Sequence, residues 1–251
     1  MRSHVTAGRR APAALGLVAA IAALAAASVL ARPAHAQVVV RPNALPATTF
    51  VGGGLSIAQP VGEFKNYVNA AVGLNFNLVQ QLDPHGVVAI RVDGGYFIYG
   101  DETKSTALSP TLGRIRVDVN TTNNIAALSI GPQLMVPNGT FRPYVTGAIG
   151  VSYFFTESSI KGSDSQNFAS TTNYDDATFA WSAGAGLYIP VRRGARPISV
   201  DIGARYHGNG QARYLKEGSI TEDGQGNIYF DPIRSNTNMI TYQIGVTFGV
   251  R

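Results

Sequence analysis

Apolar residues alternate with small or polar residues along most of this chain. The pattern is plainest at the end, where one parity holds Ile240, Tyr242, Ile244, Val246, Phe248 and Val250. The other parity holds Thr241, Gln243, Gly245, Thr247 and Gly249. A period of two predicts a β-strand with two different faces. The second face carries no charge, which favours a narrow polar interior over contact with bulk water and leaves the apolar face for lipid.

Eight segments share this alternation. They are residues 49–58, 69–78, 87–99, 125–136, 144–155, 179–191, 198–207 and 239–251. In a membrane, an open sheet edge would leave backbone groups unpaired, so the strands have to close on themselves. The pattern therefore predicts an all-β fold, an eight-stranded antiparallel up-and-down transmembrane barrel over residues 49–251.

The connections between these segments differ in length on the two sides. Residues 79–86, 137–143 and 192–197 predict short turns, whereas residues 100–124, 156–178 and 208–236 predict long polar loops. Residues 59–68 predict a shorter loop on the long-loop side. Short turns facing the periplasm and long loops facing outward are typical of such barrels.

Residues 114–120 interrupt the scheme. Ile115, Val117 and Val119 fall on the opposite parity from the apolar residues of 125–136. We expect a strand extension above the membrane, reset by a bulge or turn near residues 121–124, with a separate short hairpin as the alternative.

The first 36 residues predict a cleavable signal peptide. They have a basic start, an uncharged apolar run over residues 11–31, and Ala34-His35-Ala36 before Gln37. This matches the small-residue cleavage pattern, with Ala34, Ala36 and Gln37 at the cut. Residues 37–48, which include Pro42 and Pro46, predict an extended lead-in.

Charge is sparse once this segment is set aside. Of 20 basic and 15 acidic residues, the first 36 contain four Arg and no acid, which leaves 16 against 15. Such a balance argues against a nucleic-acid partner. Charged residues make up 14% of the chain, against roughly 25% in soluble domains. The chain has no cysteine, which excludes thiolate metal sites and Cys nucleophiles.

Two motifs in this pattern resemble a known family. The barrel segments open with Phe50-Val51-Gly52-Gly53-Gly54-Leu55-Ser56, and the end places Gln243, Gly245, Phe248 and Val250 at the spacing of an assembly signal. Together they resemble the OmpA/OmpX/OmpW-like outer-membrane β-barrel domain. The resemblance implies export to the outer membrane of a Gram-negative type of cell, contact with outer-membrane lipids, and insertion by the barrel assembly machinery.

The predicted interior contains four charged residues at similar depth. They are Arg91, Asp93, Asp201 and Arg205. We interpret them as an ion-pair network that satisfies charge inside a side-chain-filled lumen, in a protein of structural or surface-interaction type. A plug over a small-solute pore is the alternative, in which case Arg91→Ala with Arg205→Ala should raise single-channel current.

The rest of the sequence gives little evidence for a catalytic or metal-binding site. The stretch Arg205-Tyr206-His207-Gly208-Asn209 superficially resembles that of a lipid A deacylase, but Asn209 stands where the nucleophilic Ser would be. We therefore expect no enzyme, with His207 as a polar residue at the rim, and no cofactor or metal, since the loop acids lack calcium-loop spacing. The aromatic residues near the predicted strand ends predict interface girdles; they are Phe50, Tyr67, Tyr96, Tyr99, Tyr144, Tyr153, Phe155, Trp181, Tyr206 and Tyr242.

A soluble periplasmic lipocalin-like binder is the rival fold. It would carry its apolar face inward, around a ligand, and charged residues outward. The non-apolar parity here supplies mainly Gly, Ser and Thr, which favours the membrane barrel. Any surface ligand stays unknown from the sequence.

Overall fold

A computed structural model describes residues 48–107, 116–161, 167–194, 196–222 and 228–250. The chain divides into two compact units, Met1–Ala44 and Leu45–Arg251, and the description below concerns the second. The predicted signal peptide with Ala34, Ala36 and Gln37, and the lead-in up to residue 47, lie outside the described residues. Within those residues, no helix has the length and apolar character needed to cross a membrane.

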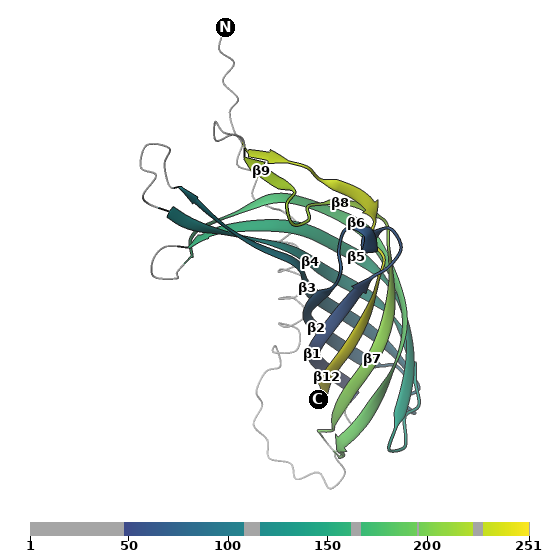
Figure 1. Cartoon of the computed structure of the whole chain (residues 1–251). Helices are drawn as coiled ribbons and strands as arrows, with labels where there is room; N and C mark the ends of the chain where they lie inside the picture. The colour runs from purple at the N-terminus through teal and green to yellow at the C-terminus, as the bar shows by residue number, and fades with distance from the viewer. Residues whose placement is uncertain (1–47, 108–115, 162–166, 195, 223–227, 251) are drawn as a thin grey trace, which may run out of the picture. The chain divides into compact units, whose positions relative to one another are not determined.

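Eight antiparallel strands close into a barrel, which confirms the predicted architecture (Figure 1). The staves are β1 (Thr49–Pro60), β2 (Ala71–Gln81), β3 (Val88–Ala107), β4 (Arg116–Met135), β5 (Arg142–Lys161), β6 (Asn167–Arg192), β7 (Ile198–Asn209) and β12 (Met239–Val250). Each stave pairs with its sequence neighbour, and β12 closes the barrel against β1. The predicted final strand is therefore the last stave.

The seam between β1 and β12 depends on facing glycines. Gly54 and Gly245 are directly paired across it. A Cβ atom on Gly54 would lie 2.2 Å from the carbonyl oxygen of Ile244, which no side chain allows. The two strands approach this closely only because neither residue has a side chain at that point.

The short turns are where the sequence predicts them. They join β2 to β3, β4 to β5 and β6 to β7, and they contain Gly86, Gly139 and Gly194, all with positive φ. Glycine adopts this backbone region without steric cost. The first residue of β1 and the last of β12, Thr49 and Val250, pair at this same end of the barrel.

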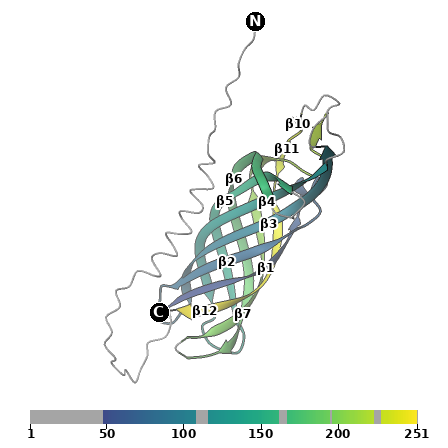
Figure 2. The same ribbon diagram turned by 90° about the vertical axis from the view of Figure 1, so that its left-hand side faces the viewer.

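Two of the three predicted long loops are strand over most of their length, so that prediction is wrong there. β3 continues to Ala107, β4 starts at Arg116, β5 continues to Lys161 and β6 starts at Asn167. These extensions form a four-stranded sheet that curves away beyond the other staves, which we call the overhang (Figures 1 and 2). Ser, Thr and Asn can pair as strand above a membrane because water and neighbouring strands satisfy their polar groups.

Residues 116–120 belong to β4, so the strand extension is confirmed and the separate hairpin is wrong. The predicted bulge near 121–124 is also misplaced: the register shifts in β3, between Ile98 and Gly100. β4 itself runs without a reset, so Val119 shares the face of Ile125. Arg114 and Ile115 lie outside the described residues.

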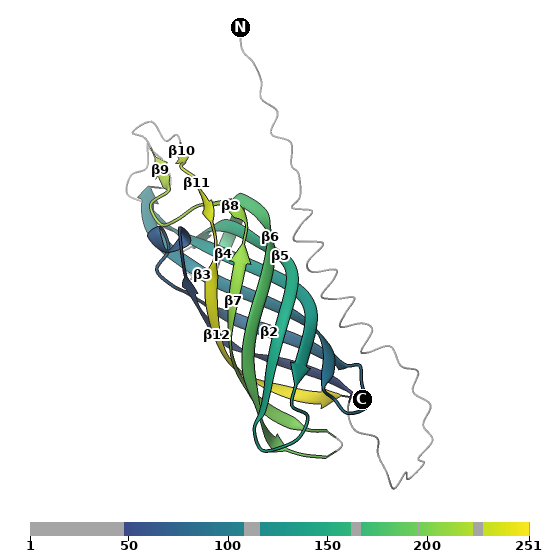
Figure 3. The same ribbon diagram turned by 90° about the vertical axis from the view of Figure 1, so that its right-hand side faces the viewer.

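The last outer connection is folded rather than irregular. It contains β8 (Gln211–Tyr214) paired with β11 (Ile233–Asn236), and β9 (Ile220–Glu222) paired with β10 (Ile228–Phe230). Figure 3 shows β8 to β11 above the outer end of the staves. The first outer connection has one 3-10 turn, η1 (Phe64–Asn66).

Candidate functional site in the barrel interior

A buried polar network fills the lumen towards the short-turn end. The Nε of Arg91 donates to Asp93 at 2.7 Å, and the Nη1 of Arg205 donates to the other Asp93 oxygen at 2.7 Å. Arg91 is fully buried, and its Nη2 lies 3.6 Å from Asp201. The structure thus brings all four predicted charges together, with Asp93 bridging the two guanidinium groups. Two positive and two negative charges balance each other in a medium that penalises any unpaired ion.

Uncharged side chains complete this network. The Nη1 of Arg91 donates to the Tyr188 hydroxyl at 2.9 Å and to Gln133 at 3.1 Å. Asp201 accepts from the Tyr144 hydroxyl at 2.7 Å and from Gln243 at 3.1 Å. Every one of these groups comes from a different stave, so the network links the barrel wall across its interior.

Tyr144 corrects one sequence-based assignment. It was predicted in an interface girdle, but it is buried in the lumen, stacked on Tyr188 at 4.6 Å and below the Arg91 guanidinium at 5.3 Å. Its parity was the available signal, because Thr146 and Ala148 share it and face inward. Tyr99 also faces inward, at the β3 bulge, and its hydroxyl donates to the Leu215 carbonyl at 3.0 Å.

Phe50 also faces inward, on the parity of Ser56 and Ala58 in β1, where it lines a small cavity with Ser199 and Thr247. The remaining girdle aromatics lie outward. Tyr67, Tyr96, Trp181 and Tyr242 are exposed. Tyr153 and Phe155 also belong to the outward parity but are covered, because they stack on each other with ring centroids 5.3 Å apart and the Tyr153 hydroxyl donates to Asp175.

An internal cavity lies beyond the polar network. Its volume is about 40 Å³, and its lining includes Asp93, Ser182, Arg205, His207 and Thr241. Such a volume admits roughly three water molecules and no acyl chain or sugar. The cavity is therefore a gap in the packing rather than a passage.

His207 lies in this cavity, so its prediction as a rim residue is wrong. Its Nε2 is 3.0 Å from the Thr241 hydroxyl oxygen on β12. The sequence motif around His207 lacks a Ser or Thr hydroxyl, and the pairing of β7 with β12 brings that of Thr241 beside the imidazole. The pair faces a cavity of about 40 Å³, which is too small for the acyl chain of a lipid substrate. His85, the other histidine in the described residues, is exposed in the turn between β2 and β3.

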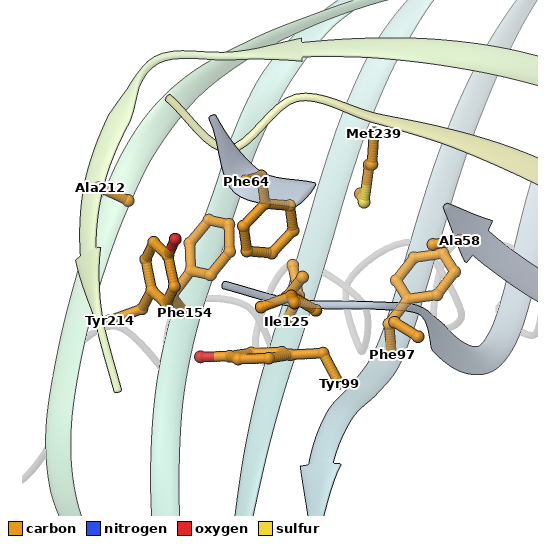
Figure 4. Packing of buried hydrophobic residues seen from close by; sticks show 11 residues of the cluster. Ala58, Phe64, Phe97, Tyr99, Ile125, Phe154, Ala212, Tyr214 and Met239 are labelled. Carbon is orange, nitrogen blue, oxygen red and sulfur yellow. The ribbon is translucent and has the colours of Figure 1, made fainter. Parts of the chain in front are cut away.

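A cluster of apolar side chains closes the outer end of the lumen, and the sequence analysis did not identify it. Phe64 of η1 is inserted into the barrel, where its ring meets Tyr99, Phe154 and Tyr214 edge to face (Figure 4). We call this the outer aromatic cluster; it is completed by Ala58, Val68, Ala71, Phe97, Ile125, Ala212 and Met239. Two outer connections thus contribute to it, η1 through Phe64 and β8 through Tyr214. Phe97 and Ile125 lie on the inward parity, and an apolar pair there was the available signal.

The last outer connection is bonded to the overhang. Glu102 accepts from the Gly218 backbone at 3.1 Å, Glu217 accepts from the Asp101 backbone at 3.2 Å, and Lys104 donates to the Ile220 carbonyl at 3.1 Å. Burial raises the pKa of Glu102, but hydrogen bonds from Gly218 and Lys104 outweigh it and hold that pKa below its ordinary value. The described outer residues therefore form a connected surface.

The residues of the predicted assembly signal lie on both faces of β12. Of the predicted assembly signal, Gln243 and Gly245 share the inward parity of β12, whereas Phe248 and Val250 share the outward one, with Phe248 exposed. Over the parts of the chain that are described, no three His, Cys, Asp or Glu side chains gather in a way that could hold a metal ion.

No family model matches the chain, and no curated protein matches it. Among solved structures it is similar to Ail, the attachment invasion locus protein of Yersinia pestis, at 11% identity over 81% of this chain and 98% of that one, TM-score 0.44. Neisserial surface protein A is similar at 11% over 81% and 98%, TM-score 0.41. The outer membrane protein OprG from Pseudomonas aeruginosa is similar at 13% over 81% and 96%, TM-score 0.40. Identities and scores this low say nothing about a ligand or a role.

Proposed function

We propose that this chain is an integral outer-membrane β-barrel protein of structural or surface-interaction type. One observation carries the proposal: a closed barrel exposes apolar side chains outward and buries polar ones inward. Leu55, Phe76 and Ile149 are 64%, 59% and 60% exposed, while Arg91 is 0% exposed. A soluble lipocalin-like barrel would have the opposite distribution, so lipid is the solvent that fits the outer face. The short turns then face the periplasm, and the overhang lies outside the cell.

The filled lumen supports an interaction role over transport. The polar network blocks the interior on the periplasmic side, and the outer aromatic cluster blocks it on the other. What stays accessible at the outer end is the overhang with the β8–β11 and β9–β10 hairpins. We propose that this surface contacts an external partner, which the described residues do not identify, and that insertion proceeds through outer-membrane lipids and the barrel assembly machinery.

Membrane fractionation with a gel assay tests the location. Expressed protein should enter the outer-membrane fraction, and unboiled protein should migrate differently from boiled protein in detergent, because the closed barrel resists unfolding. A soluble periplasmic protein with no heat-dependent shift would overturn the proposal.

We also propose that the chain is not an enzyme. The His207–Thr241 pair faces a cavity of about 40 Å³, which leaves no access for an acyl chain. Lipid A acyl composition should be the same with and without expression of the protein, and with the variant His207→Gln. Loss or gain of an acyl chain that depends on His207 would contradict this.

A small-solute pore is the second candidate function. It is favoured by the cavity of about 40 Å³, which lies between the polar network and the outer aromatic cluster. Movement of both layers would join this cavity to the two ends of the barrel and form a channel. Current recordings in planar bilayers distinguish the two functions, as argued at the scale of the whole molecule below.

A further inference from the structure

The short-turn end of the barrel carries an excess of positive charge. Arg142, Arg192, Arg193 and Arg196 lie there, and Asp83 is the acidic residue of the described turns. The Asp83 carboxylate is already engaged, since it accepts from the backbone of Val88 at 2.6 Å and of His85 at 3.1 Å. Among the described residues, no carboxylate forms an ion pair with any of the four guanidinium groups.

Arg142 begins β5 and Arg193 follows directly after β6, so both lie at the short-turn end of neighbouring strands. β5 pairs with β6 so that Arg142 is opposite Tyr188. Arg193 reaches across to donate to the Gly139 carbonyl at 3.3 Å, which links the two turns. The two guanidinium groups are close enough to repel each other. Adjacent like charges are unfavourable unless an anion lies between them.

A small cavity adjoins this pair and contains unused hydrogen-bond donors. It has a volume of about 20 Å³ and is lined by Arg142, Ser199 and Thr247 together with apolar and aromatic side chains. The Nε of Arg142 and the hydroxyl of Thr247 are both buried without a hydrogen-bond partner. Leaving a buried hydrogen-bond donor unused is unfavourable, so a ligand with acceptor oxygens would be stabilised here.

The site lies at the depth of lipid headgroups. Phe141 and Val191, the neighbours of Arg142 and Arg192, are 61% and 70% exposed. Exposed apolar side chains next to arginines mark the boundary between the hydrocarbon layer and the headgroups. Arg142 and Thr247 share the inward parity of β5 and β12, so the small cavity lies on the lumen side of the barrel wall. Free phosphate reaches that side through the mouth of the barrel, whereas a lipid phosphodiester at the same depth reaches it over the rim.

We propose that Arg142, Arg193 and Thr247 form a phosphate-binding site at the periplasmic rim. The inference rests on the proposed function for the membrane and its orientation. One phosphate oxygen would enter the small cavity and accept from Arg142 Nε and Thr247, while the other oxygens face Arg193 outside it. Guanidinium groups match phosphate because planar, charged donors make short, charge-assisted hydrogen bonds to its oxygens.

Two measurements separate the two phosphate sources. The first titrates inorganic phosphate into barrel folded in a zwitterionic detergent, by calorimetry. The second reconstitutes the protein in phosphatidylcholine vesicles with and without phosphatidylglycerol and counts retained lipids by native mass spectrometry. Wild-type protein should bind free phosphate in the first, or retain phosphatidylglycerol in preference to phosphatidylcholine in the second, according to the source.

The variants are Arg142→Gln and Thr247→Val, with Arg213→Gln as the matched control, since Arg213 is exposed at the opposite end. Arg142→Gln should weaken whichever binding is found about tenfold or more, because it removes a charge-assisted hydrogen bond. Thr247→Val should weaken it severalfold, and the control should leave it unchanged.

Heat-dependent migration of each sample shows that the barrel has formed, so failure of the proposed function is visible separately. A folded barrel that neither binds phosphate nor prefers phosphatidylglycerol would overturn the site alone. Equal loss in Arg142→Gln and Arg213→Gln would also overturn it, because binding would then reflect net charge.

Discussion

At the scale of single residues, Arg91 is the most constrained side chain of the lumen. It is fully buried, and it contacts Asp93, Gln133, Tyr188 and Asp201 from β3, β4, β6 and β7. A buried ion pair adds little net stability compared with apolar residues of the same size, but a broken one leaves an uncompensated charge. The network therefore constrains the side chains of the lumen to one arrangement, since any other would leave a buried charge unpaired.

Replacing Arg91 alone should be costly. Arg91→Met leaves Asp201 without its charged partner and Asp93 with only Arg205, and we expect a loss of about 3–5 kcal/mol in unfolding free energy. Denaturant unfolding in lipid vesicles measures it. Arg213→Gln, which removes an exposed charge, should stay within about 0.5 kcal/mol. Equal effects of the two changes would show that the network is not energetically coupled.

Asp83 predicts a pH dependence at the short turn between β2 and β3. The hydrogen bond from the Val88 backbone, helped by others from the turn, lowers the pKa of Asp83 below its ordinary value. A carboxyl whose folded pKa is lowered stabilises the fold above its unfolded pKa of about 3.9, and this contribution is lost as the pH falls through the lower folded value. Asp83→Asn should reduce stability at pH 7 and flatten its change below about pH 4. An unchanged acid profile would contradict this.

At the scale of elements, the overhang is an addition to the barrel rather than part of its closure. β2 pairs with β3 as far as Val72 and Ile98, and the β3 bulge follows directly. Beyond it, the described residues of β3 to β6 pair among themselves, and side chains of β3 make hydrogen bonds with the last outer connection. The bulge separates the two because it lets the sheet turn away from the barrel axis.

Shortening the overhang should therefore leave the barrel intact. Deleting residues 103–120 and joining Glu102 to Thr121 with a tight Asn-Gly turn removes the upper β3–β4 ladder but keeps the pairs below it. We expect the heat-dependent shift on gels to persist, while protease cleavage within residues 216–222 increases because Lys104 no longer holds Ile220. Loss of the shift would mean that the overhang contributes to closure.

At the scale of the whole molecule, two layers of different chemistry close one lumen. Charges and tyrosines fill the part near the short turns, and aromatic rings fill the part at the opposite end. Because eight strands leave an interior only as wide as side chains, either layer is enough to block it. Removing one layer should therefore not open a pore.

Single-channel conductance of variants that lack one or both layers tests this. Wild-type protein should show no stable current in planar bilayers, and Arg91→Ala with Arg205→Ala should show none either, since the outer aromatic cluster stays in place. Phe64→Ala alone should also be closed. Only the three changes together should give measurable current. An increase with the two arginine changes alone would show that the polar network is the single plug and that the pore is the better function.

The sequence predicted the barrel well for a physical reason: each stave contrasts lipid with a polar interior, so its two faces read directly as parity. The same parity placed Arg91, Asp93, Asp201 and Arg205 on one side. It did not identify Tyr144 as a lumen residue, because an aromatic near a strand end suits either the interface or the interior. It also misplaced His207, whose partner Thr241 lies on another strand.

The number of staves, their inward and outward faces and the short-turn end were determined by the sequence alone, because local alternation and turn chemistry encode them. Whether polar residues above the membrane form loops or the overhang was decided by pairing between β3, β4, β5 and β6. The tertiary structure likewise decided the insertion of Phe64 against Tyr214 and the hydrogen bond from Arg193 to the Gly139 carbonyl. These contacts join segments distant in sequence, and no local pattern records which of them meet.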